Sequence, residues 1–224
     1  MRDKRRKENF SLGGHIVDYH LNEEIYHGIY VSKLARGLAE ILGFEKETTY
    51  SLTLAGILHD IGKLQLNKYQ YKENGPLLVE EIRYVRMHTQ LGYEILKKRG
   101  DYSDFILESI YHHHENYDGS GYPDNLKGEE IPIGARILRI CDVFAALTSK
   151  RPYRSAFEQV QALELMIDEV KNFDLEIFLA FQKLIHSQGY EEFLPGGKEY
   201  EEWLDLLEKG IEKEGGSKVL SLTK

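Results

Sequence analysis

Apolar residues recur every three or four positions along most of the chain, which is the spacing of one face of an α-helix. The first run, from Glu23 to Leu42, is followed by Gly43, a residue typical of a helix C-terminus. A second helix is predicted from about Lys46 to His59. Further helices are predicted in a region that begins at Pro76, over Phe105 to His113, Ile133 to Leu147, Phe157 to Val170 and Leu175 to Ile185, and in an acidic segment with Trp203, Leu206 and Leu207.

No segment alternates apolar and polar residues with the period of two that a half-buried strand needs. We therefore predict an all-α fold, a single helical bundle. The one long irregular segment, Glu115 to Glu130, is rich in Gly, Asn, Asp and Pro. Segments of this length inside compact domains are usually functional or disordered, so this segment is a candidate for part of a site.

Length and charge narrow the function classes. A chain of 224 residues can bury a core as one domain, and its net charge of −8 disfavours broad attraction to nucleic acid or to an anionic membrane. The basic residues within 1–7 predict a solvated tail better than a binding patch. The single cysteine, Cys141, excludes an internal disulfide, and no apolar run suits a membrane span or a secretion signal. A cytoplasmic protein is predicted.

Asp142 is the first sign of a chemical site. It lies inside the apolar run Ile137 to Leu147, where an unpaired carboxylate would cost several kcal/mol. The carboxylate must therefore be neutral, paired or bound to a cation, and a salt bridge to Arg136 or Arg139 is one alternative. His59 and Asp60 end another apolar run in the same way, and two such sites indicate one shared partner.

Histidines supply the rest of a candidate metal site. Glu23 and His27 stand four residues apart, on one face of a helix. His88, His113 and His114 come from other predicted elements, and His112 lies beside them. Each residue taken alone has an ordinary structural interpretation, and only their joint occurrence indicates a metal. Imidazole and carboxylate without thiolate suit Fe, Mn, Zn or Ni better than Mg or Ca.

At these residues the sequence resembles the HD-GYP family, a branch of the HD-domain metal-dependent phosphohydrolases. His59-Asp-Ile-Gly-Lys63 resembles the HD motif, and His113-His-Glu-Asn-Tyr-Asp-Gly-Ser-Gly-Tyr-Pro123 resembles the signature that names the family. The run from Ile140 to Arg154 is also similar to the family. The resemblance extends from about Glu23 to Leu184.

The resemblance implies a helical HD-domain bundle with a metal centre in its core. It implies that His27, His59 and Asp142 hold a first metal together with Asp60, which bridges to a second. His88, His113 and His114 would complete the second metal, and Glu23 matches the extra carboxylate of members that hold a third. Two or three divalent ions, iron or manganese in this family, are the implied cofactors.

The substrate implied by the resemblance is a cyclic dinucleotide, cyclic di-GMP above all, opened by water to linear pGpG and in some members cut again to GMP. Two cations that share Asp60 could clamp the oxygens of a phosphoryl transfer and acidify a water. Asp60 and Lys63 are the predicted catalytic residues, and Lys63 would neutralise a phosphate oxygen. Arg151 and Arg154 match the family's phosphate-binding pair, although ordinary surface ion pairs are the alternative.

The signature loop, residues 118–123, is the last candidate site. Gly119 and Gly121 allow backbone angles that other residues avoid, and Pro123 stiffens the exit. Asp118 opens the loop, and Tyr122 could contact the substrate or a partner. The family resemblance implies docking of a diguanylate cyclase domain here, and a purely structural role of the loop is the alternative.

We predict three segments: an N-terminal tail over 1–20, an HD-GYP phosphohydrolase domain over 21–189 and a C-terminal helical extension over 190–224. Two other functions stay open. One is an HD-class phosphohydrolase of mononucleotides, which would need His59, Asp60 and Asp142 but not the second metal. The other is a catalytically silent module that binds a nucleotide or docks a partner.

Overall fold

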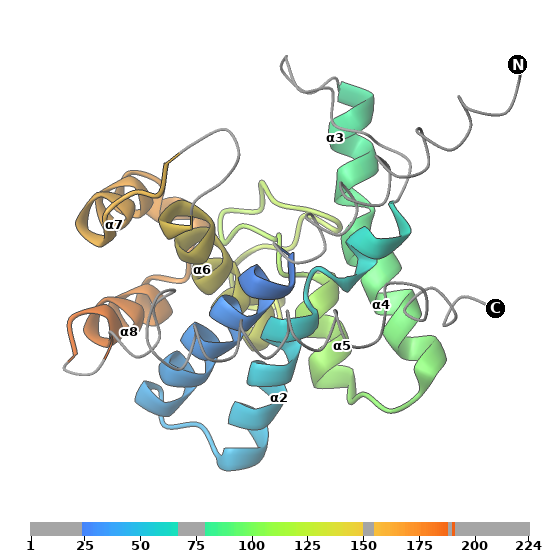
Figure 1. Ribbon diagram of the computed structural model, residues 1–224, viewed down its shortest axis with the longest axis horizontal. Coiled ribbons are helices and arrows are strands. Elements are labelled where there is room, and N and C mark those ends of the chain that lie inside the picture. The colour runs from blue at the N-terminus through green and yellow to red at the C-terminus, as the bar shows by residue number, and fades with distance from the viewer. Residues whose placement is uncertain (1–23, 67–78, 150–154, 188–189, 191–224) are drawn as a thin grey trace, which may run out of the picture. The chain divides into compact units, whose positions relative to one another are not determined.

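A computed structural model describes residues 24–66, 79–149, 155–187 and 190, and contains helices but no strand in these ranges (Figure 1). The predicted all-α fold is therefore confirmed. The chain divides into two compact units, Met1–Leu184 and Ile185–Lys224. The description below concerns the first unit, because the second contains few described residues.

The helices follow one another along the chain, and the longest described segment between two of them, residues 112–127, contains the signature loop. After a helix over residues 24–41, the chain forms α2 (Lys46–Leu58), η1 (Ile61–Gln65), α3 (Val79–Arg86), α4 (His88–Arg99), α5 (Asp104–Tyr111), η2 (Gly128–Glu130), α6 (Ile133–Thr148), α7 (Gln159–Asp168), η3 (Val170–Asn172) and α8 (Leu175–Ile185).

Most predicted helices lie where the apolar spacing placed them. The first described helix ends before Gly43, which has a φ of 76°, the left-handed conformation that favours glycine. The region that begins at Pro76 differs from the prediction, because its described part holds two helices, α3 and α4, on either side of Met87. His88 therefore begins a helix of its own, α4. The predicted acidic helix around Trp203 lies outside the described residues.

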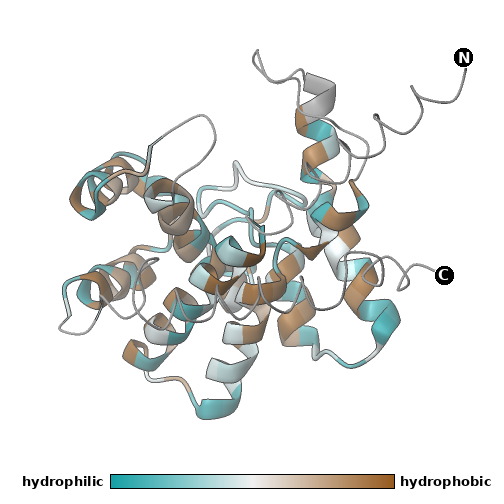
Figure 2. Ribbon diagram, in the orientation of Figure 1, coloured by the Kyte–Doolittle hydropathy of each residue, from teal (hydrophilic) through white to brown (hydrophobic). Residues whose placement is uncertain are grey.

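The hydrophobic core is centred on α6. Ile137, Leu138, Cys141 and Phe144 are completely buried there, and α6 packs against α2, α5 and α7. Figure 2 shows that apolar and polar residues share each helix, as packing around a common core requires. Burying one large apolar side chain contributes about 1.5–3 kcal/mol, so this core can hold a polar centre in its midst.

Glycine allows η1 and α4 to touch through their backbones. A Cβ atom on Gly62 would overlap the carbonyl oxygen of His88 and would crowd the amide nitrogen of Gly92. η1 follows directly after Asp60, and α4 begins with His88. This backbone contact therefore places the segment after α2 against the start of α4.

None of the helices among the described residues has both the length and the apolar character needed to cross a bilayer.

Candidate metal centre

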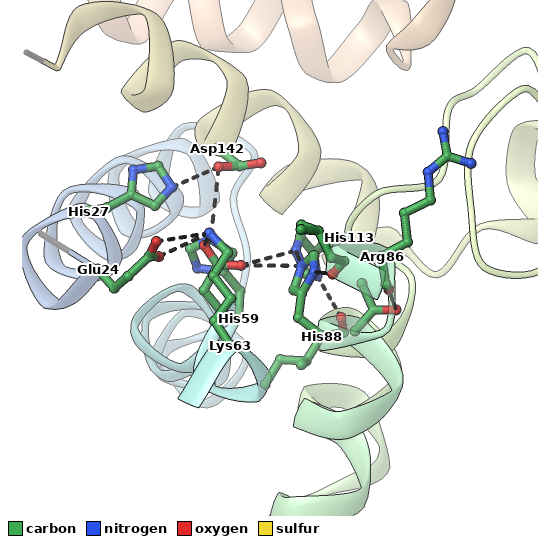
Figure 3. Close-up of polar contacts among 12 residues, drawn as sticks. Glu24, His27, His59, Lys63, Arg86, His88, His113 and Asp142 are labelled. Carbon is green, nitrogen blue, oxygen red and sulfur yellow. Dashed lines mark hydrogen bonds and ion pairs between the residues drawn. The ribbon is translucent and has the colours of Figure 1, made fainter. Parts of the chain in front are cut away.

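Seven titratable side chains from five helical regions converge in the core (Figure 3). They fall into two groups that share Asp60. The first group is His27, His59 and Asp60, joined by Asp142, and the second group is Asp60, His88, His113 and His114. Apart from Asp142, one ligand atom of each residue lies within 4.8 Å of those of the others in its group.

Carboxylates and imidazoles alternate in the first group. Asp142 Oδ1 lies 2.8 Å from His27 Nε2 and 3.8 Å from His59 Nε2. His59 Nε2 is in turn 3.1 Å from Asp60 Oδ2. The first helix, the end of α2 and the middle of α6 thus each contribute to one cluster of donor atoms.

The alternative of a salt bridge from Asp142 to an arginine is not adopted among the described residues. Arg136 instead pairs with Asp174 at 2.7 Å, and Arg139 Nε donates a hydrogen bond to Asn116 Oδ1 at 3.0 Å. The contacts of Asp142 are with histidines, as a shared cation site requires.

The second group contains three imidazoles around one carboxylate. His88 Nε2 lies 3.2 Å from Asp60 Oδ1, and His113 Nε2 lies 4.0 Å from the same oxygen. The Nε2 atoms of His88 and His113 are 3.3 Å apart. The His114 ring lies 4.2 Å from that of His113, centroid to centroid.

Backbone carbonyls orient the rings. Nδ1 of His59, His88 and His113 is 2.8, 2.6 and 2.6 Å, respectively, from the carbonyl oxygen three residues earlier in the chain. When Nδ1–H donates to this carbonyl, Nε2 is the unprotonated nitrogen of a neutral ring and faces the centre. The local helical geometry thereby fixes the direction of each ring and the tautomer that each ring adopts when it is neutral.

Two buried atoms test whether a metal fits the cluster. His59 Nε2 and Asp60 Oδ1 are buried and have no hydrogen-bond partner in the described residues. Leaving such a group unpaired costs about 1–3 kcal/mol, and a cation bound there would satisfy both atoms. Nitrogen and oxygen donors without sulfur suit a divalent ion such as iron, manganese or zinc. The cluster therefore fits a divalent metal centre.

The groups differ in their protonation. Burial alone would lower the pKa of His59, but the neighbouring Asp60 carboxylate outweighs it and raises that pKa to about 9. Burial alone would raise the pKa values of Asp60 and Asp142. His59 and Lys63 nevertheless hold the pKa of Asp60 well below its usual range, and His27 does the same for the pKa of Asp142. In the absence of a metal, the first group is an internal ion-pair network.

Burial dominates in the second group. It lowers the pKa of His88, takes that of His113 well below its usual range and lowers that of His114 to about 3. Neighbouring imidazoles or Lys63 add to the effect by disfavouring further positive charge. These three rings are neutral near pH 7, the form in which imidazole binds metals.

Lys63 has a partner that the sequence reasoning missed. Its Nζ lies 2.7 Å from Asp60 Oδ2 and 3.0 Å from Glu24 Oε2. Burial would lower the Lys63 pKa, but the carboxylates of Asp60 and Glu24 raise it well above its usual range. Glu23, the carboxylate singled out in the sequence, lies outside the described residues. The acidic neighbour at position 24 was the available signal.

The signature loop packs against the second group. The Tyr122 ring stacks on the His114 ring at 4.8 Å between centroids, and the Arg86 guanidinium lies 4.8 Å from the Tyr122 centroid. Glu115 is buried, and its Oε1 accepts a hydrogen bond of 2.7 Å from the Asp124 amide. Neither Arg86 nor Glu115 was predicted as a site residue.

Glycines and short polar contacts fix the shape of the signature loop. A Cβ atom on Gly121 would overlap the backbone of Glu115, and Gly119 has a φ of 86°. Asp118 Oδ1 accepts hydrogen bonds from the amide and hydroxyl of Ser120. The Tyr122–Pro123 peptide bond is cis. The backbone angle predicted for these glycines is observed at Gly119, whereas Gly121 is needed because the Glu115 backbone approaches it closely.

One described residue of the predicted site stands apart from the cluster. His112, predicted beside the site, is buried and turns to Asp124, with Nε2 and Oδ2 3.2 Å apart. Arg151 and Arg154 lie outside the described residues, so their phosphate-binding role stays a prediction.

Known proteins resemble this chain in sequence. The family model of the HD domain matches residues 7–177. The chain is 35% identical over 159 residues to a cyclic di-GMP phosphodiesterase of Pseudomonas aeruginosa, covering 71% of this chain and 38% of that protein. It is 36% identical over 164 residues to the cyclic di-GMP phosphodiesterase response regulator RpfG of Xanthomonas campestris, covering 72% of this chain and 43% of that protein. It is 34% identical over 170 residues to a 3′3′-cGAMP-specific phosphodiesterase of Vibrio cholerae, covering 75% of this chain and 39% of that protein.

The chain thus spans about two fifths of the length of these curated relatives. Among solved structures, the HDG"Y"P protein Bd1817 of Bdellovibrio bacteriovorus is similar with a TM-score of 0.61 and 22% identity, over 73% of this chain and 53% of that one. The HD domain of PgpH from L. monocytogenes, solved with cyclic-di-AMP, is similar with a TM-score of 0.52 and 17% identity, over 74% of this chain and 92% of that one. At these identities the structural likeness supports the fold. Because the HD family model covers most of the chain, which also carries the His113–Pro123 signature, the chain belongs to the HD domain family and to its HD-GYP branch.

Proposed function

We propose that this chain is a metal-dependent phosphodiesterase that hydrolyses a cyclic dinucleotide, cyclic di-GMP above all, to linear pGpG and, by a second cut, to GMP. The observation that carries the proposal is Asp60, whose carboxylate belongs to both groups of candidate ligands. The names of the relatives support the substrate class, since they are phosphodiesterases of cyclic di-GMP and of cGAMP.

In this proposal the two groups hold two divalent cations, iron or manganese. His27, His59, Asp60 and Asp142 would hold one, and Asp60, His88, His113 and His114 would hold the other. Bound there, the cations supply Lewis-acid stabilisation of phosphoryl oxygens and acidify a water, so that no side-chain nucleophile is required. A third cation at Glu23 would need residues outside the described ranges.

Lys63 acts in this proposal as a cation that binds phosphate. Its ammonium remains protonated over the physiological pH range because the carboxylates of Asp60 and Glu24 raise its pKa. It therefore cannot serve as a general base, but it can donate a hydrogen bond to a phosphate oxygen or to the leaving oxygen. Its side chain is 29% exposed, so a ligand in the site could reach it.

The remaining predicted contacts are proposals of the same kind. Tyr122, stacked on His114, would line the substrate site, and Arg151 and Arg154 would bind a phosphate. The signature loop would dock a diguanylate cyclase domain. We further propose a catalytic domain over 21–189, a helical extension over 190–224 and a cytoplasmic location, for which the single, free Cys141 thiol is the support.

Turnover of cyclic di-GMP tests the proposal. Protein purified without oxygen and loaded with iron or manganese should convert cyclic di-GMP to pGpG or GMP, as measured by chromatography of the nucleotides. Parallel reactions with 3′3′-cGAMP define the preferred cyclic dinucleotide. If neither metal supports cleavage of any cyclic dinucleotide, the proposal is wrong.

Metal content separates the proposal from its two alternatives. Two or more metals per chain are expected for the proposed enzyme. One metal per chain together with hydrolysis of mononucleotides would favour the mononucleotide phosphohydrolase. Binding of a cyclic dinucleotide without turnover in the metal-replete protein would favour the silent module.

A further inference from the structure

A pocket of about 320 Å³ lies next to the second group. On one side it is lined by Arg83 and Arg86 from α3 and by Gln90 from α4, and on the other by Tyr122 of the signature loop and by Asn125. A volume of this order suits part of a small-molecule ligand. Nothing in the proposed chemistry at the metals uses Arg83 or Arg86.

The charge of this pocket is opposite to that of the whole chain. The chain carries a net charge of −8, yet the pocket lining contains two arginines and no carboxylate. Neither Arg83 nor Arg86 forms an ion pair with a carboxylate within the described residues. Arg83 and Arg86 are three positions apart on α3, which places both on one side of the helix. The pocket therefore offers two guanidinium groups to an anion.

Tyr122 connects the pocket to the metal-ligand cluster. Its ring stacks on His114 at 4.8 Å, and the guanidinium of Arg86 lies 4.8 Å from the centre of the same ring. Figure 3 shows Arg86 on the His88 and His113 side of the cluster, with its guanidinium directed away from these two rings. A ligand held at the cluster could therefore extend past Tyr122 to Arg86.

The amide side chains of the pocket are already engaged. Gln90 Nε2 donates to Glu94 Oε1 at 2.9 Å, and Asn125 Nδ2 donates to the Gly121 carbonyl. Each amide keeps a second N–H and its carbonyl oxygen, but neither amide is charged. The two guanidinium groups are the cations of the pocket lining, and their planar forks suit the oxygens of a phosphate. The charge of the pocket therefore favours binding of an anion.

We propose that the Arg83–Arg86 pocket binds the second phosphate of the substrate, the one that is not cut. This inference rests on the proposed function, because a cyclic dinucleotide has two phosphodiester groups and only one can undergo hydrolysis at the metals at a time. The other keeps its negative charge and is stabilised by the two arginines. The pocket would thus select dinucleotides over substrates with a single phosphodiester.

Inhibition by cyclic di-GMP measures the contribution of the pocket. The assay follows hydrolysis of bis(p-nitrophenyl) phosphate, a single phosphodiester, by the metal-loaded full chain and determines the inhibition constant of cyclic di-GMP. Arg83→Gln and Arg86→Gln should each raise this constant about tenfold to a hundredfold, the range for loss of a charged hydrogen bond. Arg86→Lys, which keeps the charge but not the fork, should raise it less.

Arg99→Gln is the matched control, because it removes the same charge from an arginine at the end of α4 that lies 3.7 Å from Asp101. It should leave the inhibition constant within twofold of the wild-type value. Arg83→Gln keeps the Arg86–Tyr122 contact, so its effect cannot arise from a displaced Tyr122.

The outcomes separate this inference from the proposed function. Equal inhibition constants for the wild type, Arg83→Gln and Arg86→Gln would overturn the pocket assignment even if cyclic di-GMP is cut. Equal losses for bis(p-nitrophenyl) phosphate and for cyclic di-GMP would also overturn it, since the arginines would then act on the metal site as a whole. If cyclic di-GMP inhibits but is never cut, the proposed function fails, while weaker inhibition of the variants still supports the pocket.

Discussion

The two groups of candidate ligands solve the problem of burying titratable residues differently. In the first, Asp60 and Asp142 lie beside the protonated His59 ring, so charge is buried as ion pairs. In the second, His113 and His114 are buried as neutral rings around one carboxylate. The second group is thus ready to bind a metal near pH 7, whereas a metal that enters the first must displace a proton. Asp60 couples the two groups.

The largest expected effect is on the shared residue. Asp60→Asn should remove metal from both groups and lower phosphodiesterase activity by roughly a thousandfold, because no other carboxylate among the described ligands is common to both groups. Metal content and turnover of cyclic di-GMP are the measurements, with circular dichroism to check that the helices remain.

Asp101→Asn, at an exposed position, is the control for the same chemical change and should keep both metal and activity. If Asp60→Asn still bound two metals per chain, the assignment of Asp60 as the bridging ligand would have to be abandoned.

Single-group variants should separate the two halves. Asp142→Asn should lower metal content by about one ion per chain at the first group, and His113→Ala should do so at the second, since each removes one donor from one cluster. Anomalous scattering from crystals of each variant locates the remaining ion. Loss of both ions in both variants would mean that the groups bind metal only as a unit.

A smaller effect is expected from Glu24, which we regard as a positioning residue because it acts through Lys63. Glu24→Gln should lower kcat for cyclic di-GMP by about tenfold, in the range seen for residues that orient an active group. KM and metal content should change little, because Lys63 keeps its contact with Asp60. A Glu24→Asp variant should recover part of the loss, and a fall in metal content instead would make Glu24 a ligand.

The smallest effect is on the stability of protein freed of metal by a chelator. His113 and His114 have lowered pKa values, so below about pH 6.5 the unfolded chain takes up protons that the folded chain does not. Stability is therefore lost as the pH falls toward 3. His59, with a pKa raised to about 9, behaves in the opposite way: its contribution is present below pH 6.5 and is lost as the pH rises through 9.

The free energy of unfolding, measured with urea across this pH range, should thus fall on both the acid and the alkaline side. His114→Gln should flatten the acid side of the profile alone. His59→Gln should remove the loss on the alkaline side and should also flatten the acid side, because His59 holds down the pKa of Asp60. An alkaline side that His59→Gln leaves unchanged would contradict the assignment of opposite proton states to the two groups.

Helices and the chemical identity of the cluster could be predicted from the sequence because both leave local signals. The three-to-four spacing located α6 and α8, and the buried carboxylate Asp142 indicated that a partner must exist. The structure brings the predicted metal ligands of the described ranges together, while their roles as ligands stay predictions. Spacing alone did not show the break at Met87, since apolar residues continue across it.

Contacts between residues distant in sequence could not be predicted. Glu24 meets Lys63 across 39 positions, and Arg86 meets Tyr122 because the signature loop returns to α3. Nothing in the sequence near Arg86 distinguishes it from a surface arginine of a helix. Such pairings depend on how the helices pack, which a single sequence does not specify.

Gly62 lies at the close backbone contact between the segment that carries Asp60 and the start of α4. It lies two residues after Asp60 and touches the backbone of His88. This one backbone contact therefore limits how far Asp60 and His88 lie from each other. A methyl group there would push the segment that carries Asp60 away from the segment that carries His88, without removing any donor atom. The spacing of the candidate ligands is therefore sensitive to a residue that has no side chain to offer.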